Sequence, residues 1–222
     1  MHDDDFNGFR SLALDPSALI MDVGANRGQS IASLKTIFPS GVVHAFEANP
    51  TFFEALEELH GVFPETLFVH RFGLGRTRSD LQFYVPWVGR TPYLEESSTR
   101  LDYFSKPWVV EKFRSRGEMQ LVETLVEVRP GDELALDPDI IKIDVEGAEL
   151  DVLIGLSETL QRAQPTLLVE NSDWHNVTAF LDKLDFVPYR WEGISARFVP
   201  FYGETTNTFY FHRSKPPNVT VP

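Results

Sequence analysis

Residues 19–30 read LIMDVGANRGQS, an apolar run that breaks into a turn with two spaced glycines. This pattern predicts a buried strand, a tight turn and the start of a helix. Gly24 and Gly28 allow backbone conformations or close approaches that a Cβ atom would block, and the free amides at a helix start face whatever lies beyond the strand. The stretch therefore predicts a nucleotide-sized pocket, although such glycines can also serve only a tight turn with close helix packing.

A second apolar run, VVHAF at residues 42–46, ends at Glu47. An acidic residue after the second strand, about 20 residues past the glycines, is placed to accept hydrogen bonds from a ribose. The glycine turn lacks the third glycine that serves a pyrophosphate in dinucleotide sites. Asp22 would repel a phosphate but attract a cation, so the pattern favours S-adenosylmethionine, which carries an amino group, a sulfonium and no phosphate.

Strand and helix patterns alternate along most of the chain, which predicts a parallel sheet. Residues 1–18 form a short leading helix or arm in this interpretation. We expect strands over residues 19–23, 42–46, 66–70, 140–144, 165–170, 186–189 and 206–212. The expected fold is α/β, with a mostly parallel, doubly wound sheet, an antiparallel closing strand and one domain over residues 1–222.

The alternation is interrupted between the third and fourth strands. Residues 81–85 and 119–126 look like alternating strands that pair beside the sheet, and residues 86–118 between them carry six aromatic residues and six Lys or Arg. Connections of this length are often functional lids, so we expect an acceptor-binding lid at about 86–118. The alternative is a solvated connection with a few aromatic anchors.

Four of the expected strands end in acidic residues: Asp22, Glu47, Asp144 and Glu170. Ligands of open parallel sheets bind beyond the carboxyl ends of the strands, so these acids should share one rim. The alternative interpretation is that charged residues simply terminate buried strands.

Three motifs resemble the FkbM family of S-adenosylmethionine-dependent methyltransferases: DVGANRG at 22–28, EANP at 47–50 and IKIDVEGAE at 141–149. The resemblance covers about residues 18–190 and implies a Rossmann-like class I methyltransferase fold with O-methylation of sugar or polyketide hydroxyls. It also implies that Gly24, Asn26 and Gly28 shape the methionine pocket and that Glu47 holds the ribose hydroxyls. Residues 97–99, Ser-Ser-Thr, resemble a serine-rich segment of the family.

The candidate site residues fall into two groups. Methyl transfer to an alcohol needs a base for the hydroxyl proton, and we expect Asp144 or Glu146 in this role, followed by Glu170 and His175. We expect no bound metal, although a carboxylate cluster could instead hold a divalent cation that lowers the pKa of the acceptor hydroxyl. The residues expected at the cofactor are Asp22, Gly24, Ala25, Asn26, Gly28, Glu47, Ala48, Asn49, Gly73 and Asp144.

Three other polar residues lie within expected strands and receive structural interpretations. His44 and His70 are expected to satisfy local hydrogen bonds. Lys142 is expected to be an edge or snorkelling residue of its strand.

The composition limits the partners. A net charge of −13 argues against a nucleic acid, and the absence of cysteine excludes thiolate chemistry. No signal peptide or membrane span is visible, so we expect a cytoplasmic protein, whose Asn-x-Thr triplets at Asn176 and Asn218 occur by chance. We expect a small-molecule or glycan acceptor; the alternatives are a nucleotide-dependent oxidoreductase, a sugar-modifying enzyme on the same fold, or a non-catalytic binding protein.

Overall fold

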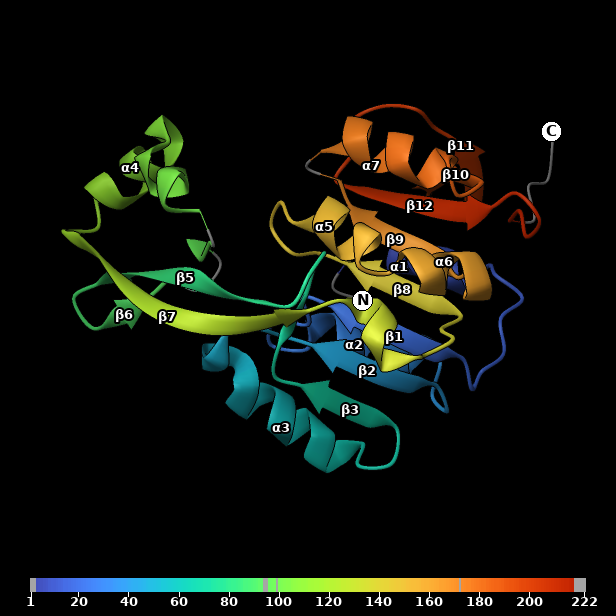
Figure 1. The fold of residues 1–222 in the computed structure, drawn as a ribbon, viewed down its shortest axis with the longest axis horizontal. Helices are drawn as coiled ribbons and strands as arrows, with labels where there is room; N and C mark the ends of the chain where they lie inside the picture. Colours follow the sequence, from blue (N-terminus) through green and yellow to red (C-terminus); the bar gives the residue numbers. More distant parts are fainter. Residues whose placement is uncertain (1–2, 94–95, 99, 172, 218–222) are drawn as a thin grey trace.

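The main sheet has eight strands in the order β11-β10-β12-β9-β8-β1-β2-β3 (Figure 1). The structure, a computed structural model, describes residues 3–93, 96–98, 100–171 and 173–217. Five strands are parallel: β1 (Leu19–Val23), β2 (Val42–Phe46), β3 (Leu67–His70), β8 (Ile140–Ile143) and β9 (Thr166–Glu170). Three join antiparallel: β12 (Asn207–His212), β10 (Phe186–Glu192) and β11 (Arg197–Pro200). The predicted parallel sheet with an antiparallel closing strand is confirmed, and β11 is an addition that the sequence analysis did not anticipate.

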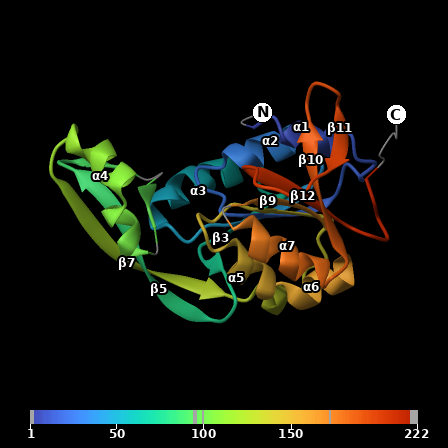
Figure 2. The same ribbon diagram turned by 90° about the horizontal axis from the view of Figure 1, so that it is seen from above.

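Helices cover both faces of this sheet (Figure 2). Buried side chains of α1 (Phe6–Arg10), α2 (Gln29–Ile37) and α3 (Phe53–Val62) form one core cluster. Those of α5 (Glu149–Ile154), α6 (Ser157–Ala163) and α7 (Trp174–Asp182) belong to a second cluster. Short 3₁₀ turns, η1 (Pro50–Phe52) and η4 (Gly131–Leu134), complete this part of the chain. Strands buried between two helical layers explain the continuous apolar runs of the sequence.

A second, four-stranded sheet stands apart from the first, in the order β4-β7-β5-β6. It consists of β4 (Gly73–Leu74), β5 (Ser79–Val88), β6 (Thr91–Pro92) and β7 (Met119–Arg129). Strands β5 and β7 pair antiparallel from Ser79↔Val128 to Val88↔Met119, which confirms the predicted pairing of residues 81–85 with 119–126. The hairpin projects from the body as an arm (Figure 1).

The end of the arm has a small apolar core of its own. Two helical segments, η3 (Leu101–Ser105) and α4 (Pro107–Arg114), pack there through Phe104, Val109 and Phe113. Within the described part of the chain, no helix has the length and apolar character needed to cross a bilayer.

Candidate active site

The glycine turn after β1 brings two loops into contact. Gly24 has φ 79°, and a Cβ atom there would lie 1.7 Å from the carbonyl oxygen of Asp144. Gly28 has φ 87°, and its Cβ would lie 2.0 Å from Leu59 of α3. Gly28 therefore permits close helix packing, whereas Gly24 lets the β1 loop lie directly against the β8 loop, where Asp144 stands.

Glu47 ties the β1 and β2 loops together. Its carboxylate accepts hydrogen bonds from the backbone amides of Asn26, at 2.8 Å, and Asn49, at 2.7 Å. The side chain is 8% exposed, and burial raises the pKa of Glu47 although the two amides oppose that shift. The residue expected at the ribose is thus also a structural link between two loops that border the site.

Lys142 is a central residue of the sheet, so its interpretation as an edge or snorkelling residue was wrong. Strand β8 lies between β1 and β9, and the Lys142 side chain is 6% exposed. Its Nζ atom donates to the Gly24 carbonyl at 2.8 Å and lies 3.3 Å from carboxylate oxygens of both Asp22 and Asp144. Burial acts to lower the pKa of Lys142, but these two carboxylates outweigh it and raise the pKa. Lys142 therefore fixes Asp144 relative to the glycine turn.

A cavity of about 620 Å³ lies beyond the carboxyl ends of β1, β2 and β8. This size falls within the usual range for small-molecule sites. It is bordered by seven of the expected site residues: Gly24, Glu47, Ala48, Asn49, Gly73, Asp144 and Glu146.

The other expected cofactor residues are not among those that border the cavity. Asp22 is fully buried, where it accepts a hydrogen bond from Ser30 at 2.5 Å and pairs with Lys142. Ala25, Asn26 and Gly28 form the turn beneath the wall and do not border the described cavity. Their expected direct contact with the cofactor remains a prediction.

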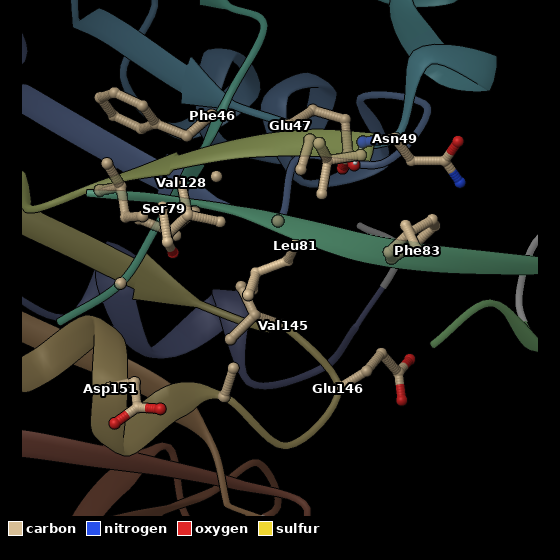
Figure 3. A pocket seen from close by; sticks show the side chains of 18 of the residues that line it. Phe46, Glu47, Asn49, Ser79, Leu81, Phe83, Val128, Val145, Glu146 and Asp151 are labelled. Carbon is tan, nitrogen blue, oxygen red and sulfur yellow. Dashed lines mark hydrogen bonds between the residues drawn. The ribbon is translucent and has the colours of Figure 1, made fainter. Parts of the chain in front are cut away.

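The base of the arm forms a wall of the cavity that the sequence analysis missed. Ser79, Leu81 and Phe83 of β5 line it together with Val128 of β7 (Figure 3). Val126 of β7 is also a lining residue. These residues alternate along the two paired strands and share one face of the hairpin. The sequence shows the alternating pattern of these two strands, but it does not show which face of the hairpin would lie against the main sheet.

The predicted lid segment contributes less to the cavity than its composition suggested. Among the described residues of 86–118, Ser97 alone lines the cavity. The Tyr93 ring packs edge-on against Phe113, with centroids 5.1 Å apart, and Arg116 lies over Tyr93. These aromatic and basic side chains hold the end of the arm together.

Three carboxylates converge at the rim of the sheet. Oxygens of Asp144, Glu146 and Glu170 lie within 4.8 Å of one another. Glu146 is exposed, but partial loss of solvent at its carboxyl, with the charges of Asp144 and Glu149, raises its pKa to about 7. Loss of solvent raises the pKa of Glu170 to about 8, and so does a hydrogen bond that its protonated carboxyl donates to the Asp144 carboxylate. Such pKa values suit a general base near neutral pH, and the same set of oxygens could hold a divalent cation.

The histidines differ in their surroundings, and the role expected for His175 as a base stays a prediction. His175 lies in the first turn of α7, where its ring stacks on Trp174 at 3.7 Å, and it is not a member of the carboxylate cluster found among the described residues. His44 Nδ1 and His70 Nε2 are 2.9 Å apart on neighbouring strands. The prediction of local hydrogen bonding for His44 and His70 is confirmed.

The fold is that of the class I methyltransferases. A similar fold occurs in the crystal structure of Methyltransferase FkbM from Methylobacillus flagellatus, with a TM-score of 0.60, 19% identity, and coverage of 90% of this chain and 45% of that one. The family follows from the sequence: the chain belongs to the FkbM methyltransferases, because the Methyltransferase FkbM domain model matches residues 22–189. The resemblance of the three motifs is thereby confirmed.

Two curated relatives are similar over part of their length. "Methyltransferase 1" from Beauveria bassiana is 31% identical over 153 residues, which are 64% of this chain and 59% of the relative. "Hexuronic acid methyltransferase AglP" from Haloferax volcanii is 29% identical over 148 residues, 64% of this chain and 52% of the relative. The chain thus spans between half and three fifths of the curated relatives it matches.

Proposed function

We propose that this protein is an S-adenosylmethionine-dependent O-methyltransferase that acts on a hydroxyl of a sugar, a glycan or a polyketide-type natural product. The observation that carries the proposal is the position of Glu146. The carboxyl group of Glu146, which lies beside those of Asp144 and Glu170, lines the same cavity as the glycine turn and the acidic residue after β2. The proposed base, Glu146, and the proposed nucleoside site therefore lie in the same cavity.

The chain's residues fit the cofactor. Gly24 and Glu47 both line the cavity, and Gly24 has no side chain that would fill it. Asn49 also lines the cavity, and its buried Nδ2 atom has no hydrogen-bond partner among the described residues. A buried donor left unpaired is costly, so a polar ligand group at Asn49 would stabilise the site. Val126 and Val128 of the hairpin wall offer an apolar surface that suits a face of an adenine ring. When bound, the cofactor supplies an electrophilic methyl group on its sulfonium.

Glu146 takes the acceptor proton in this proposal. Glu146 borders the cavity and has a left-handed φ of 55° beside Gly147 in the loop after β8. Asp144 is held by Lys142 at 3.3 Å, which suits it to positioning Glu146 and the cofactor. Glu170 is a second carboxyl that can receive the proton from the rim.

The net charge of the chain and the name of one relative both bear on the class of acceptor. A net charge of −13 makes a nucleic acid a poor partner and favours a small molecule or glycan. The relative named as a hexuronic acid methyltransferase supports a sugar hydroxyl.

Incubation with S-[methyl-¹³C]adenosylmethionine and a panel of glycosides and macrolides tests the proposal. One labelled methyl on an acceptor oxygen is the expected product, detected by mass spectrometry and NMR. Tight binding of S-adenosylhomocysteine without transfer to any hydroxyl in the panel would instead support a binding protein.

A further inference from the structure

Ser97 has a buried hydroxyl with no hydrogen-bond partner among the described residues. The side chain is 8% exposed and lines the cavity together with Phe83 and Glu146. An unpaired buried hydroxyl is unfavourable unless a ligand completes its hydrogen bonds. The hydroxyl of Ser97 therefore points to a polar group of a bound molecule.

The backbone on both sides of Ser97 is fixed. Ser98 exchanges two hydrogen bonds with Tyr84 of β5, Tyr84 N to Ser98 O at 2.9 Å and Ser98 N to Tyr84 O at 3.0 Å. On the other side, the buried Glu96 accepts from Tyr103 Oη at 2.9 Å and from Lys112. Ser97 is thus held in place by the arm while its own side chain stays available, as a preorganised binding group requires.

The charges around this end of the cavity are negative. Asp144, Glu146 and Glu170 converge there. Arg76 is the one cation among the described residues that line the cavity, and its guanidinium pairs with Asp151 at 2.9 Å. Figure 3 shows Asp151 well away from Glu146 and Phe83, so this ion pair belongs to the opposite end. Lys142, which also lies near Glu146 in the described part of the chain, is already shared by Asp22 and Asp144. An anionic acceptor near Glu146 would therefore meet mainly like charges.

An apolar surface borders the same cavity as Glu146. Phe83 and Leu81 share one face of β5 and border the cavity. A pyranose ring has an apolar C–H face and polar edges, which matches an aromatic ring on one side and hydroxyl or carboxyl groups on the other.

From these observations we infer that the Glu146 end of the cavity binds an uncharged glycoside and discriminates against a uronate, with Ser97 Oγ hydrogen-bonded to a hydroxyl of the sugar. This inference rests on the proposed function and narrows it. It sets this chain apart from the relative named for hexuronic acid.

The test compares two probes with the same aglycone, p-nitrophenyl β-D-glucopyranoside and p-nitrophenyl β-D-glucuronide. Calorimetry at pH 8.5 uses the full chain saturated with S-adenosylhomocysteine. We expect the glucoside to bind at least about tenfold more tightly than the glucuronide. Ser97→Ala should weaken glucoside binding about five- to tenfold, in line with the loss of one hydrogen bond. Glu146→Gln should lower the ratio of glucoside affinity to glucuronide affinity, because it removes a negative charge that repels the glucuronide.

Ser105→Ala is the matched control, since it makes the same substitution at an exposed position of the arm outside the cavity. It should leave the affinities for the glucoside and the glucuronide unchanged. The wild-type, Ser97→Ala and Ser105→Ala proteins should bind S-adenosylhomocysteine equally well. Equal or tighter binding of the glucuronide, no binding of the glucoside, or an unchanged glucoside affinity in Ser97→Ala would overturn the inference. Failure of the wild-type chain to bind S-adenosylhomocysteine would overturn the proposed function and, with it, this inference.

Discussion

Replacing Glu146 by glutamine removes the proposed base while it keeps the size and shape of the side chain. A carboxyl with a pKa of about 7 is about one-eleventh ionised at pH 6 and about ten-elevenths ionised at pH 8. Wild-type turnover should therefore rise about tenfold between these pH values and level off above pH 8. In Glu146→Gln, turnover should fall on the order of 10² to 10⁴ fold, the usual contribution of a positioned base, and the rise near pH 7 should disappear.

Asp144→Asn provides the comparison. Asp144 raises the pKa of Glu146 through its charge, so the amide should move the inflection of the pH profile below 7 while the profile keeps its shape. The assay is the initial rate of S-adenosylhomocysteine formation at saturating acceptor, from pH 5.5 to 9, with calorimetry to show that cofactor affinity is retained. Because the pKa of Glu146 is raised in the folded state, its ionisation opposes folding between about pH 4.5 and pH 7. Glu146→Gln should therefore unfold at no lower temperature than wild type at pH 8.

Near-wild-type turnover in a folded Glu146→Gln protein would refute the assignment of the base. If chelators abolish wild-type activity and added divalent ions restore it, the three carboxylates act as a metal site and the proton goes elsewhere.

Three further predictions concern the cofactor loops, the sheet and the arm. Glu47→Ala should weaken S-adenosylhomocysteine binding by roughly 1.5 to 3 kcal/mol in calorimetry and also lower the Tm, because two backbone amides lose their acceptor; unchanged affinity would remove Glu47 from the cofactor site. Lys142→Met should lower the free energy of unfolding by about 3 to 5 kcal/mol in urea titrations, since Asp22 and Asp144 lose their shared cation, and a stability equal to wild type would show that the ion pairs are dispensable. Replacing residues 86–118 by a short turn should spare cofactor affinity and raise the acceptor KM, whereas an unchanged KM would exclude the segment from the acceptor site.

Much of the fold was predictable because its signals are local. Apolar runs that end in acidic residues and are followed by helical patterns are typical of parallel strands. In a parallel sheet the carboxyl ends of all strands lie on the same side, so Asp144 and Glu170 were expected there whatever the order of the strands. The glycine turn was likewise predictable, since Gly24 and Gly28 both adopt the positive φ that favours glycine.

The rest depended on tertiary packing. Lys142 was misplaced because the sequence does not give the position of β8 between β1 and β9. Ser79, Leu81 and Phe83 were missed as site residues, since only the docking of the arm decides which face of β5 meets the cavity. Several aromatic residues near the arm's tip, among them Tyr93, Phe104 and Phe113, form a small core there, and the role of residues 86–118 as a lid stays a prediction.

Competitive calorimetry of the wild-type chain with S-adenosylhomocysteine and NAD tests the central claim most directly, because it needs no knowledge of the acceptor. We predict that one S-adenosylhomocysteine binds per chain and that NAD neither binds comparably nor displaces it, since the turn after β1 lacks the glycine that a pyrophosphate needs. Tighter binding of NAD, or no binding of S-adenosylhomocysteine, would contradict the account.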